Sequence, residues 1–187
     1  ERVNGGSMKN GESLSEKAYQ LLKEDIITCR LFPGERISQA DLSQQMEIGM
    51  TPIRDALHRL VMEGFVDSIP RYGYIVTGID AAYVTEIFEV RLILEKAIVK
   101  LAAERCDNKT LESIREMADF KYVFKERETY LEFYERNANF HKAIAEATGN
   151  TRLIDLFSKL MVEMTRLFFL GIEARDRSEE MRKVHIS

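Results

Sequence analysis

The sequence predicts a mostly α-helical protein in two parts, of which only the first includes a short β-ribbon. Apolar residues recur at helical spacing over most of the 187 residues. Residues 65–79 instead alternate between apolar and polar side chains, which is typical of strands. Apolar residues make up 45% and charged residues 31% of the chain, a composition that suits a helix-rich globular protein of one large or two small domains.

The ends and the composition suggest how the chain is organised. Residues 1–7, `ERVNGGS`, precede a methionine and resemble an expression leader. We expect one domain over residues 8–78 and another over residues 79–187. No apolar run reaches the about 18 residues of a membrane helix. We therefore expect no membrane partner. Cys29 and Cys106 form no spaced framework, which favours free thiols and a cytoplasmic location.

The first two helices are predicted from periodicity and capping. Apolar residues follow helical spacing over residues 13–31, and `FPGE` ends that helix as a turn. A second helix is expected over residues 39–46. Ser38 can cap it, and Asp41, three residues on, completes a capping box in which Asp replaces Glu or Gln.

A third helix and a ribbon follow. Thr51 is expected to cap the helix, Pro52 to occupy its first position, and Gly64 to end it. Strands are predicted over residues 65–69 and 74–79 around the tight turn `PRYG`. Three short helices and a two-stranded ribbon form a winged helix-turn-helix, whose third helix enters the DNA major groove.

The rest of the chain is helical in pattern and forms an all-α bundle. The bundle appears truncated at its C-terminus, since its last helix starts at Ser178 and the sequence stops without a cap or turn. Gly149 and Asn150 close the third of these helices. The helices before the last are predicted over residues 81–106, 109–128, 129–150 and 151–174.

Two ordered motifs give these parts a resemblance to a known family. The stretch `DLSQQMEIGMTPIRDALHRLVMEGFV`, followed by `RYGYIV`, resembles the DNA-binding domain of GntR-family bacterial transcription regulators. The stretches `EVRLILEKA` and `NANFHKAIAEATGN` resemble the FCD effector domain of its FadR-like branch. The chain departs from the family at Gly49 and Met50, where Ser or Thr and Arg are usual, and at Ala40, where Arg is common.

The resemblance implies that the third helix and the wing tip contact DNA. Thr51, Arg54 and His58 lie near one helix face. Arg54 can bind guanine or clamp a phosphate, and Thr51 with the helix N-terminus suits a phosphate. By charge alone these side chains could be an ordinary solvated face, because residues 1–80 carry 9 basic and 12 acidic residues. The full predicted set is Ser38, Gln39, Met50, Thr51, Arg54, His58, Arg71, Tyr72 and Gly73.

Arg91 is the predicted effector-binding residue of the second part. It interrupts an otherwise apolar stripe, where an unpaired arginine is unfavourable. It could anchor the carboxylate of an effector through two hydrogen bonds. It could equally form a structural pair with Glu95 one turn on.

Asn137 and His141 are candidate metal ligands, since spacing i, i+4 places them on one helix face. In FCD domains the corresponding pair is Asp and His, completed by later histidines. Here Asn137 replaces the Asp, and His185 is the remaining candidate in the second part. Mixed N and O ligands would suit zinc, nickel or manganese, and no organic cofactor is expected. His141 could instead be an ordinary helix histidine.

The leading functional prediction is a DNA-binding transcriptional regulator and not an enzyme. A homodimer would bind palindromic operator DNA, and a small carboxylic acid in the C-terminal domain would control its affinity. One alternative is an interaction protein whose winged helix has lost DNA binding. The other is a metal-dependent hydrolase built on His141, which is disfavoured because the sequence has only three histidines and no evident nucleophile–base pair.

Overall fold

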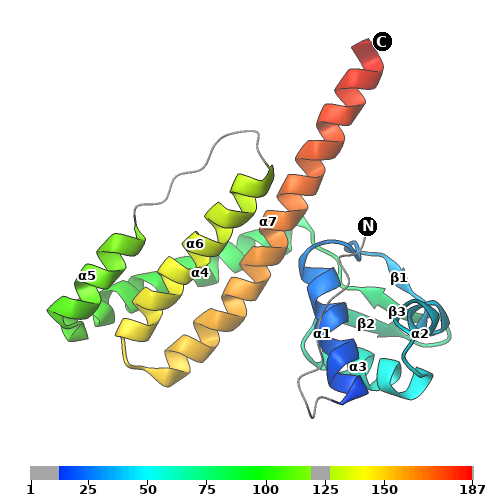
Figure 1. The fold of residues 1–187 in the computed structure, drawn as a ribbon, viewed down its shortest axis with the longest axis horizontal. Coiled ribbons are helices and arrows are strands. Elements are labelled where there is room, and N and C mark those ends of the chain that lie inside the picture. Colours follow the sequence, from blue (N-terminus) through cyan, green and yellow to red (C-terminus); the bar gives the residue numbers. More distant parts are fainter. Residues whose placement is uncertain (1–12, 119–126, 187) are drawn as a thin grey trace. The chain divides into compact units, whose positions relative to one another are not determined.

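The computed structural model describes residues 13–118 and 127–186, which form two compact units. The first unit runs to Asp80 and also includes the chain from Thr165 onward, and the second is Ala81–Met164. The structure confirms the predicted fold class, a winged helix-turn-helix part followed by helices alone (Figure 1). Residues 1–7, the expected leader, lie outside the described residues.

The first unit is built on two helices that pack against each other. The elements of this unit up to Asp80 are, in chain order, α1 (Leu14–Ile27), β1 (Arg36–Ile37), α2 (Gln39–Met46), α3 (Met50–Met62), β2 (Val66–Ile69) and β3 (Gly73–Val76). α1 packs on α3, which also contacts α2 and β2. The two helices bury apolar side chains between them, among them Leu22, Ile26, Ile53, Leu57 and Leu60. This core fixes one side of α3 and leaves the other side exposed.

The capping predictions for α2 and α3 differ in outcome. The Ser38 hydroxyl accepts a hydrogen bond from the backbone N–H of Asp41 at 3.3 Å, as predicted. α3, however, begins at Met50 with Gly49 as its N-cap, so the predicted cap at Thr51 is wrong. Pro52 is therefore the third helical residue, which is tolerated because the first four N–H groups of a helix have no intrahelical partner.

The wing has three strands where the sequence predicted two. All pairs are antiparallel, in the order β1-β3-β2. β1 pairs Ile37 with Tyr74, and β2 pairs Val66 with Val76. β1 escaped prediction because two residues are too short to show alternation, and only pairing with β3 makes them a strand.

The second unit is a helical bundle. Its helices are α4 (Ala81–Arg105), α5 (Asn108–Met117), α6 (Arg127–Ala147) and the first part of α7 (Thr151–Ile186). α6 packs on α4 and α5. The buried core of this unit joins α4, α6 and α7 through Ile98, Ala145, Phe157 and Leu160.

Two helix boundaries differ from the expectation. The helix predicted over residues 109–128 ends at Met117, and residues 119–126 lie outside the described residues. The separate last helix predicted from Ser178 is instead the end of the continuous α7. After Gly171 the sequence of α7 has no Gly or Pro, so no residue in this stretch interrupts the helix.

A buried arginine lies in the part of α7 that belongs to the first unit. Arg166 is 1% exposed, and its guanidinium donates a hydrogen bond to the backbone carbonyl of Thr77. The Cys29 thiol lies 3.8 Å from the backbone carbonyl of Arg166.

Both cysteines are free thiols. None of the described helices is long and apolar enough to cross a membrane.

Candidate functional site

The exposed face of α3 carries the residues predicted to contact DNA. Met50, Thr51, Arg54 and His58 are all exposed. His58 lies beside the ring of Tyr74 on β3, with the ring centroids 6.2 Å apart. The guanidinium of Arg54 has no hydrogen bond or ion pair with the other described residues. It is therefore available to a ligand at this surface.

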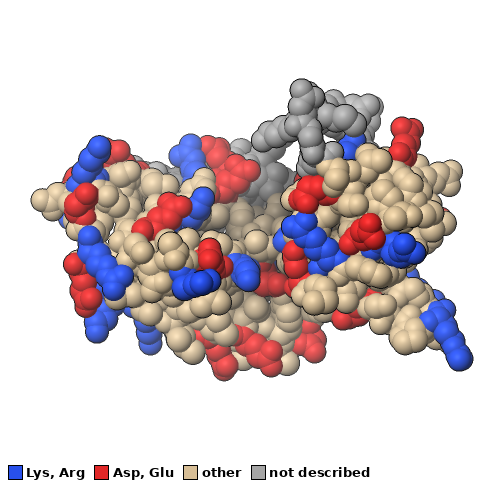
Figure 2. All heavy atoms as spheres, turned by 90° about the horizontal axis from the view of Figure 1, so that it is seen from below, with Lys and Arg blue, Asp and Glu red and all other residues tan. Residues whose placement is uncertain are grey.

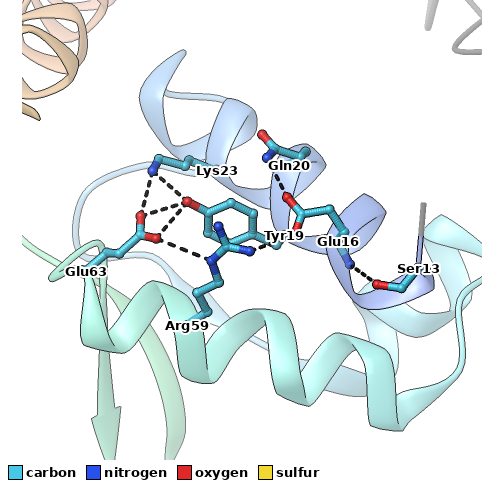
Figure 3. A network of polar contacts seen from close by, with 7 residues as sticks. All are labelled: Ser13, Glu16, Tyr19, Gln20, Lys23, Arg59 and Glu63. Atoms are coloured by element: carbon cyan, nitrogen blue, oxygen red, sulfur yellow. Dashed lines mark hydrogen bonds and ion pairs between the residues drawn. The ribbon is translucent and has the colours of Figure 1, made fainter. Parts of the chain in front are cut away.

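The second arginine of α3, Arg59, contacts other side chains of the protein (Figure 3). Its guanidinium stacks on the ring of Tyr19 at 3.6 Å from the centroid. It also pairs with Glu16 of α1 at 2.7 Å and with Glu63 at 3.5 Å. Charge alone did not distinguish Arg54 from Arg59, whereas the packing of α1 on α3 does.

A network of polar contacts continues from Arg59 and fixes α3 to α1. The Tyr19 hydroxyl donates to the Glu63 carboxylate at 2.7 Å, and Lys23 pairs with the same carboxylate at 2.6 Å. Burial alone would raise the pKa of Glu63, but the hydrogen bonds from Lys23 and Tyr19 outweigh it and hold that pKa below its ordinary value. Glu63 is therefore ionised at neutral pH and holds the C-terminal end of α3.

The wing tip presents the second group of predicted residues. Arg71 has a left-handed backbone (φ 67°), and Gly73 follows at φ 91°. Tyr72 is 70% exposed. The guanidinium of Arg36 lies 5.7 Å from the centre of the Tyr72 ring. Sequence reasoning missed Arg36, because only the pairing of β1 with β3 brings this cation beside the wing tip.

The start of α2 holds the remaining predicted residues. Ser38 is its N-cap, and Gln39 is its first residue. The Ser38 oxygen accepts the capping hydrogen bond, which leaves the hydroxyl hydrogen free to be donated. Basic and acidic side chains are interspersed on the face that Figure 2 shows, in line with the balanced charge of the sequence.

In the second unit, Arg91, Glu95 and His141 form one polar cluster. Arg91 Nε lies 3.0 Å from Glu95 Oε1, and His141 Nδ1 lies 3.2 Å from the same oxygen. All three side chains are 21–27% exposed. His141 also lies beside the buried ring of Phe157, with centroids 6.5 Å apart. Of the two interpretations of Arg91, the pair with Glu95 is present, and Nε is the atom that it uses.

The protonation of His141 follows from its surroundings. Burial lowers its pKa, the nearby Glu95 carboxylate raises it, and Arg91 lowers it again. The net effect is a pKa below the ordinary value, so the imidazole is neutral at pH 7. A neutral His141 can donate its Nδ1 hydrogen to Glu95 and leave Nε2 as an acceptor.

The predicted metal ligands are not brought together as a set. Asn137 lies one turn before His141 on α6, whereas His185 belongs to the other compact unit, and its side chain lies outside the described residues. Among the described residues, no three His, Cys, Asp or Glu side chains are arranged to hold a metal. The described residues fit a hydrogen-bonded cluster and not a metal centre.

Comparison with known families gives these two sites their context. The pattern of the bacterial regulatory proteins of the gntR family matches residues 14–76. The FCD domain pattern matches residues 86–186, more than half of the chain. The chain belongs to the GntR family and carries an FCD domain. It is thus a transcriptional regulator of this family, as the sequence motifs predicted.

Relatives of this GntR-family chain are named as regulators. It is 21% identical to the transcriptional repressor RspR of Escherichia coli K12 over 175 residues, which cover 94% of this chain and 77% of RspR. It is 27% identical to the regulator McbR of the same strain over 184 residues, or 97% of this chain and 83% of McbR.

Solved structures resemble the GntR-family chain as well. The structure of E. coli McbR/YncC aligns with a TM-score of 0.62 at 25% identity, covering 87% of this chain and 77% of that one. A GntR regulator from Rhodococcus sp. RHA1 aligns with a TM-score of 0.63 at 20% identity, covering 85% and 76%. The second likeness supports the fold alone.

Proposed function

We propose that the chain is a cytoplasmic regulator that binds operator DNA sequence-specifically as a homodimer, with α3 of each copy in the major groove. The observation that carries the proposal is the contrast between the two arginines of α3. Arg59 is bound by α1, whereas Arg54 is exposed and has no partner among the described residues. An arginine at this position of a recognition helix can bind a guanine edge through two hydrogen bonds.

The first turn of α3 offers a second contact. Its N-cap, Gly49, provides no side-chain hydrogen bond, so the N–H groups of the first turn remain open to solvent. Such groups and the helix dipole favour a phosphate. Thr51, exposed in this turn, adds a hydroxyl. We propose that this turn contacts the DNA backbone while Arg54 reads a base.

The experiment that tests this proposal compares two single-arginine variants. A binding sequence is first selected from random DNA duplexes with the wild-type protein. Arg54→Ala is expected to weaken binding by about 1–3 kcal/mol and to relax base preference at one position. Arg115→Ala is the control, because Arg115 is an exposed arginine on α5 that pairs with Glu112. Fluorescence anisotropy measures both, and equal affinities would remove Arg54 from the interface.

We further propose that a small carboxylic acid binds at Arg91 and controls operator affinity. In the described contacts Arg91 uses only Nε, so its two terminal amino groups remain available for a bidentate carboxylate. The partly buried setting beside His141 and Phe157 would strengthen such a bond. An open hollow of about 670 Å³ between α5 and α6 is less suitable, because Lys142 there already pairs with Glu146.

A panel of small mono- and dicarboxylic acids tests the effector site by thermal unfolding. An acid present at 100 times its Kd should stabilise the wild-type protein by about 2.7 kcal/mol. Arg91→Gln should abolish this gain, and Arg91→Lys should weaken it, since lysine keeps the charge but loses the planar fork. Arg115→Gln is the control. If Arg91→Gln responds as the wild type does, the acid binds elsewhere.

A resident metal is not part of this proposal, because no three His, Cys, Asp or Glu side chains of the described residues come together to hold one. The second candidate function is an interaction protein that does not bind DNA. The charge balance of residues 1–80 favours it, with 9 basic and 12 acidic residues. The salt dependence of DNA binding separates the two candidates.

A further inference from the structure

Helix α4 exposes large apolar side chains outside the part that packs in its core. Ile87, Leu94 and Ile98 face the core of the second unit. The large apolar residues outside it are each 46–68% exposed, namely Phe88, Val90, Leu92, Ile93 and Val99. Large apolar side chains that are exposed together on a surface mark a site of contact with another molecule. The exposed face of α4 therefore fits a partner surface.

The charges on this face are arranged symmetrically around Ile93, which is 68% exposed. Glu86 lies seven residues before Ile93, and Lys100 lies seven residues after it. Seven residues are about two helical turns and about 10 Å, so these three side chains form one row. Glu89 and Lys96 form a parallel row, four residues before and three after Ile93.

These four charged side chains are free to meet a partner. Glu86, Glu89, Lys96 and Lys100 are exposed, and none has an ion pair with the other described residues. The N-terminal half of the face is thus acidic and the C-terminal half is basic. Such a surface is complementary to a copy of itself turned end to end.

We propose that this face of α4 binds the same face of a second copy, with the two helices antiparallel across a twofold axis at Ile93. In this arrangement Glu86 meets Lys100 of the second copy, Glu89 meets Lys96, and Ile93 packs against its own copy at the centre. A parallel arrangement would place like charges together. The inference rests on the homodimer of the proposed function and assigns its interface.

Sedimentation velocity of the full chain tests the apolar centre. Ile93→Asp places the two introduced carboxylates of the copies against each other at the twofold axis. The Kd of the dimer is therefore expected to rise by at least about 30-fold. Leu156→Asp is the matched control, since Leu156 is an apolar residue of α7 that is 57% exposed. Circular dichroism confirms that both variants keep their helix content. A dimer in Ile93→Asp as tight as in the wild type would overturn the interface.

Charge reversal tests the orientation of the two copies. Glu86→Lys with Glu89→Lys, or Lys96→Glu with Lys100→Glu, should each weaken the homodimer, because like charges then meet. The two double variants should form a heterodimer when mixed, and the fourfold variant should recover the wild-type Kd. A fourfold variant no tighter than the double variants would overturn the antiparallel pairing.

The proposed function can fail separately from this interface. If Ile93→Asp stays dimeric and still binds the selected DNA, another surface forms the dimer and the DNA-binding proposal stands. If the wild type is a dimer that Ile93→Asp splits, but no DNA is bound, the interface stands and the DNA-binding proposal fails. A wild type that is monomeric overturns the interface outright.

Discussion

The roles of individual side chains here depend on what each one contacts. Arg54 and Arg59 lie on the same helix, but Arg59 stacks on Tyr19 and pairs with Glu16, while Arg54 has no such partner among the described residues. Local spacing cannot distinguish them, because the partners of Arg59 are 40 and 43 residues away in the sequence. The same holds for His141, whose neighbour Glu95 comes from another helix.

The setting of His141 predicts how stability depends on pH. Its pKa in the folded chain lies below the ordinary value of 6.5, chiefly because of burial. The unfolded chain therefore takes up a proton below about pH 6.5 that the folded chain resists, and this contribution to stability is full above that pH. We expect the free energy of unfolding to fall as pH drops from 7.5 toward the folded pKa.

Urea unfolding at several pH values checks this expectation. His141→Gln should flatten the dependence of the unfolding free energy on pH between about 7.5 and 5, since the titrating group is gone. His58→Gln, at an exposed position on α3, is the control and should keep the wild-type slope. Equal slopes in the wild type and His141→Gln would show that His141 does not carry the effect.

At the scale of elements, two glycines differ in position: one follows the end of a helix, and the other lies inside a helix. Gly64 follows α3 at φ +80°, a left-handed conformation that lets the chain turn from the helix into β2. Gly171 lies inside α7, and an added Cβ there would meet nothing within 4 Å. Both residues belong to the first compact unit.

These two glycines should respond to the same substitution with opposite signs. Gly64→Ala is expected to destabilise the first unit by about 1 kcal/mol, because alanine is strained at positive φ while the space around it is open. Gly171→Ala should stabilise it by about 0.5–1 kcal/mol, since alanine loses less backbone entropy in a helix. Denaturant titration measures both, and a stabilising Gly64→Ala would contradict the role of the left-handed turn.

At the scale of the whole molecule, DNA binding has to come from a few placed cations, because the net charge is −4. Each copy offers Arg54 on α3, and Arg36 and Arg71 at the wing. The proposed homodimer would double this number and would space the two α3 helices for half-sites about one turn apart. Dimerisation therefore matters for affinity as well as for the symmetry of the operator.

This cation count predicts a salt dependence. If Arg36 and Arg71 of each copy neutralise about four phosphates in the dimer, the logarithm of its binding constant should fall with the logarithm of salt concentration at a slope of about −3.6. Arg71→Ala should reduce the slope by about 2, one contact from each copy. Anisotropy titrations between about 50 and 200 mM salt measure it. A flat response would favour the interaction protein that does not bind DNA.

Local sequence signals by themselves determined most of the helices, the wing hairpin, the Ser38 cap and the family. These features follow from periodicity, turn residues and capping, which act over a few neighbouring residues. Only the tertiary structure decided that Arg36 joins the wing, that Arg59 contacts Tyr19 and Glu16 of α1, and that Arg91 and His141 share Glu95. Most of these contacts join residues of different helices or strands, and the Arg91–Glu95 pair is one of two pairings that the sequence allowed. Side-chain packing in the folded chain determines which contacts form.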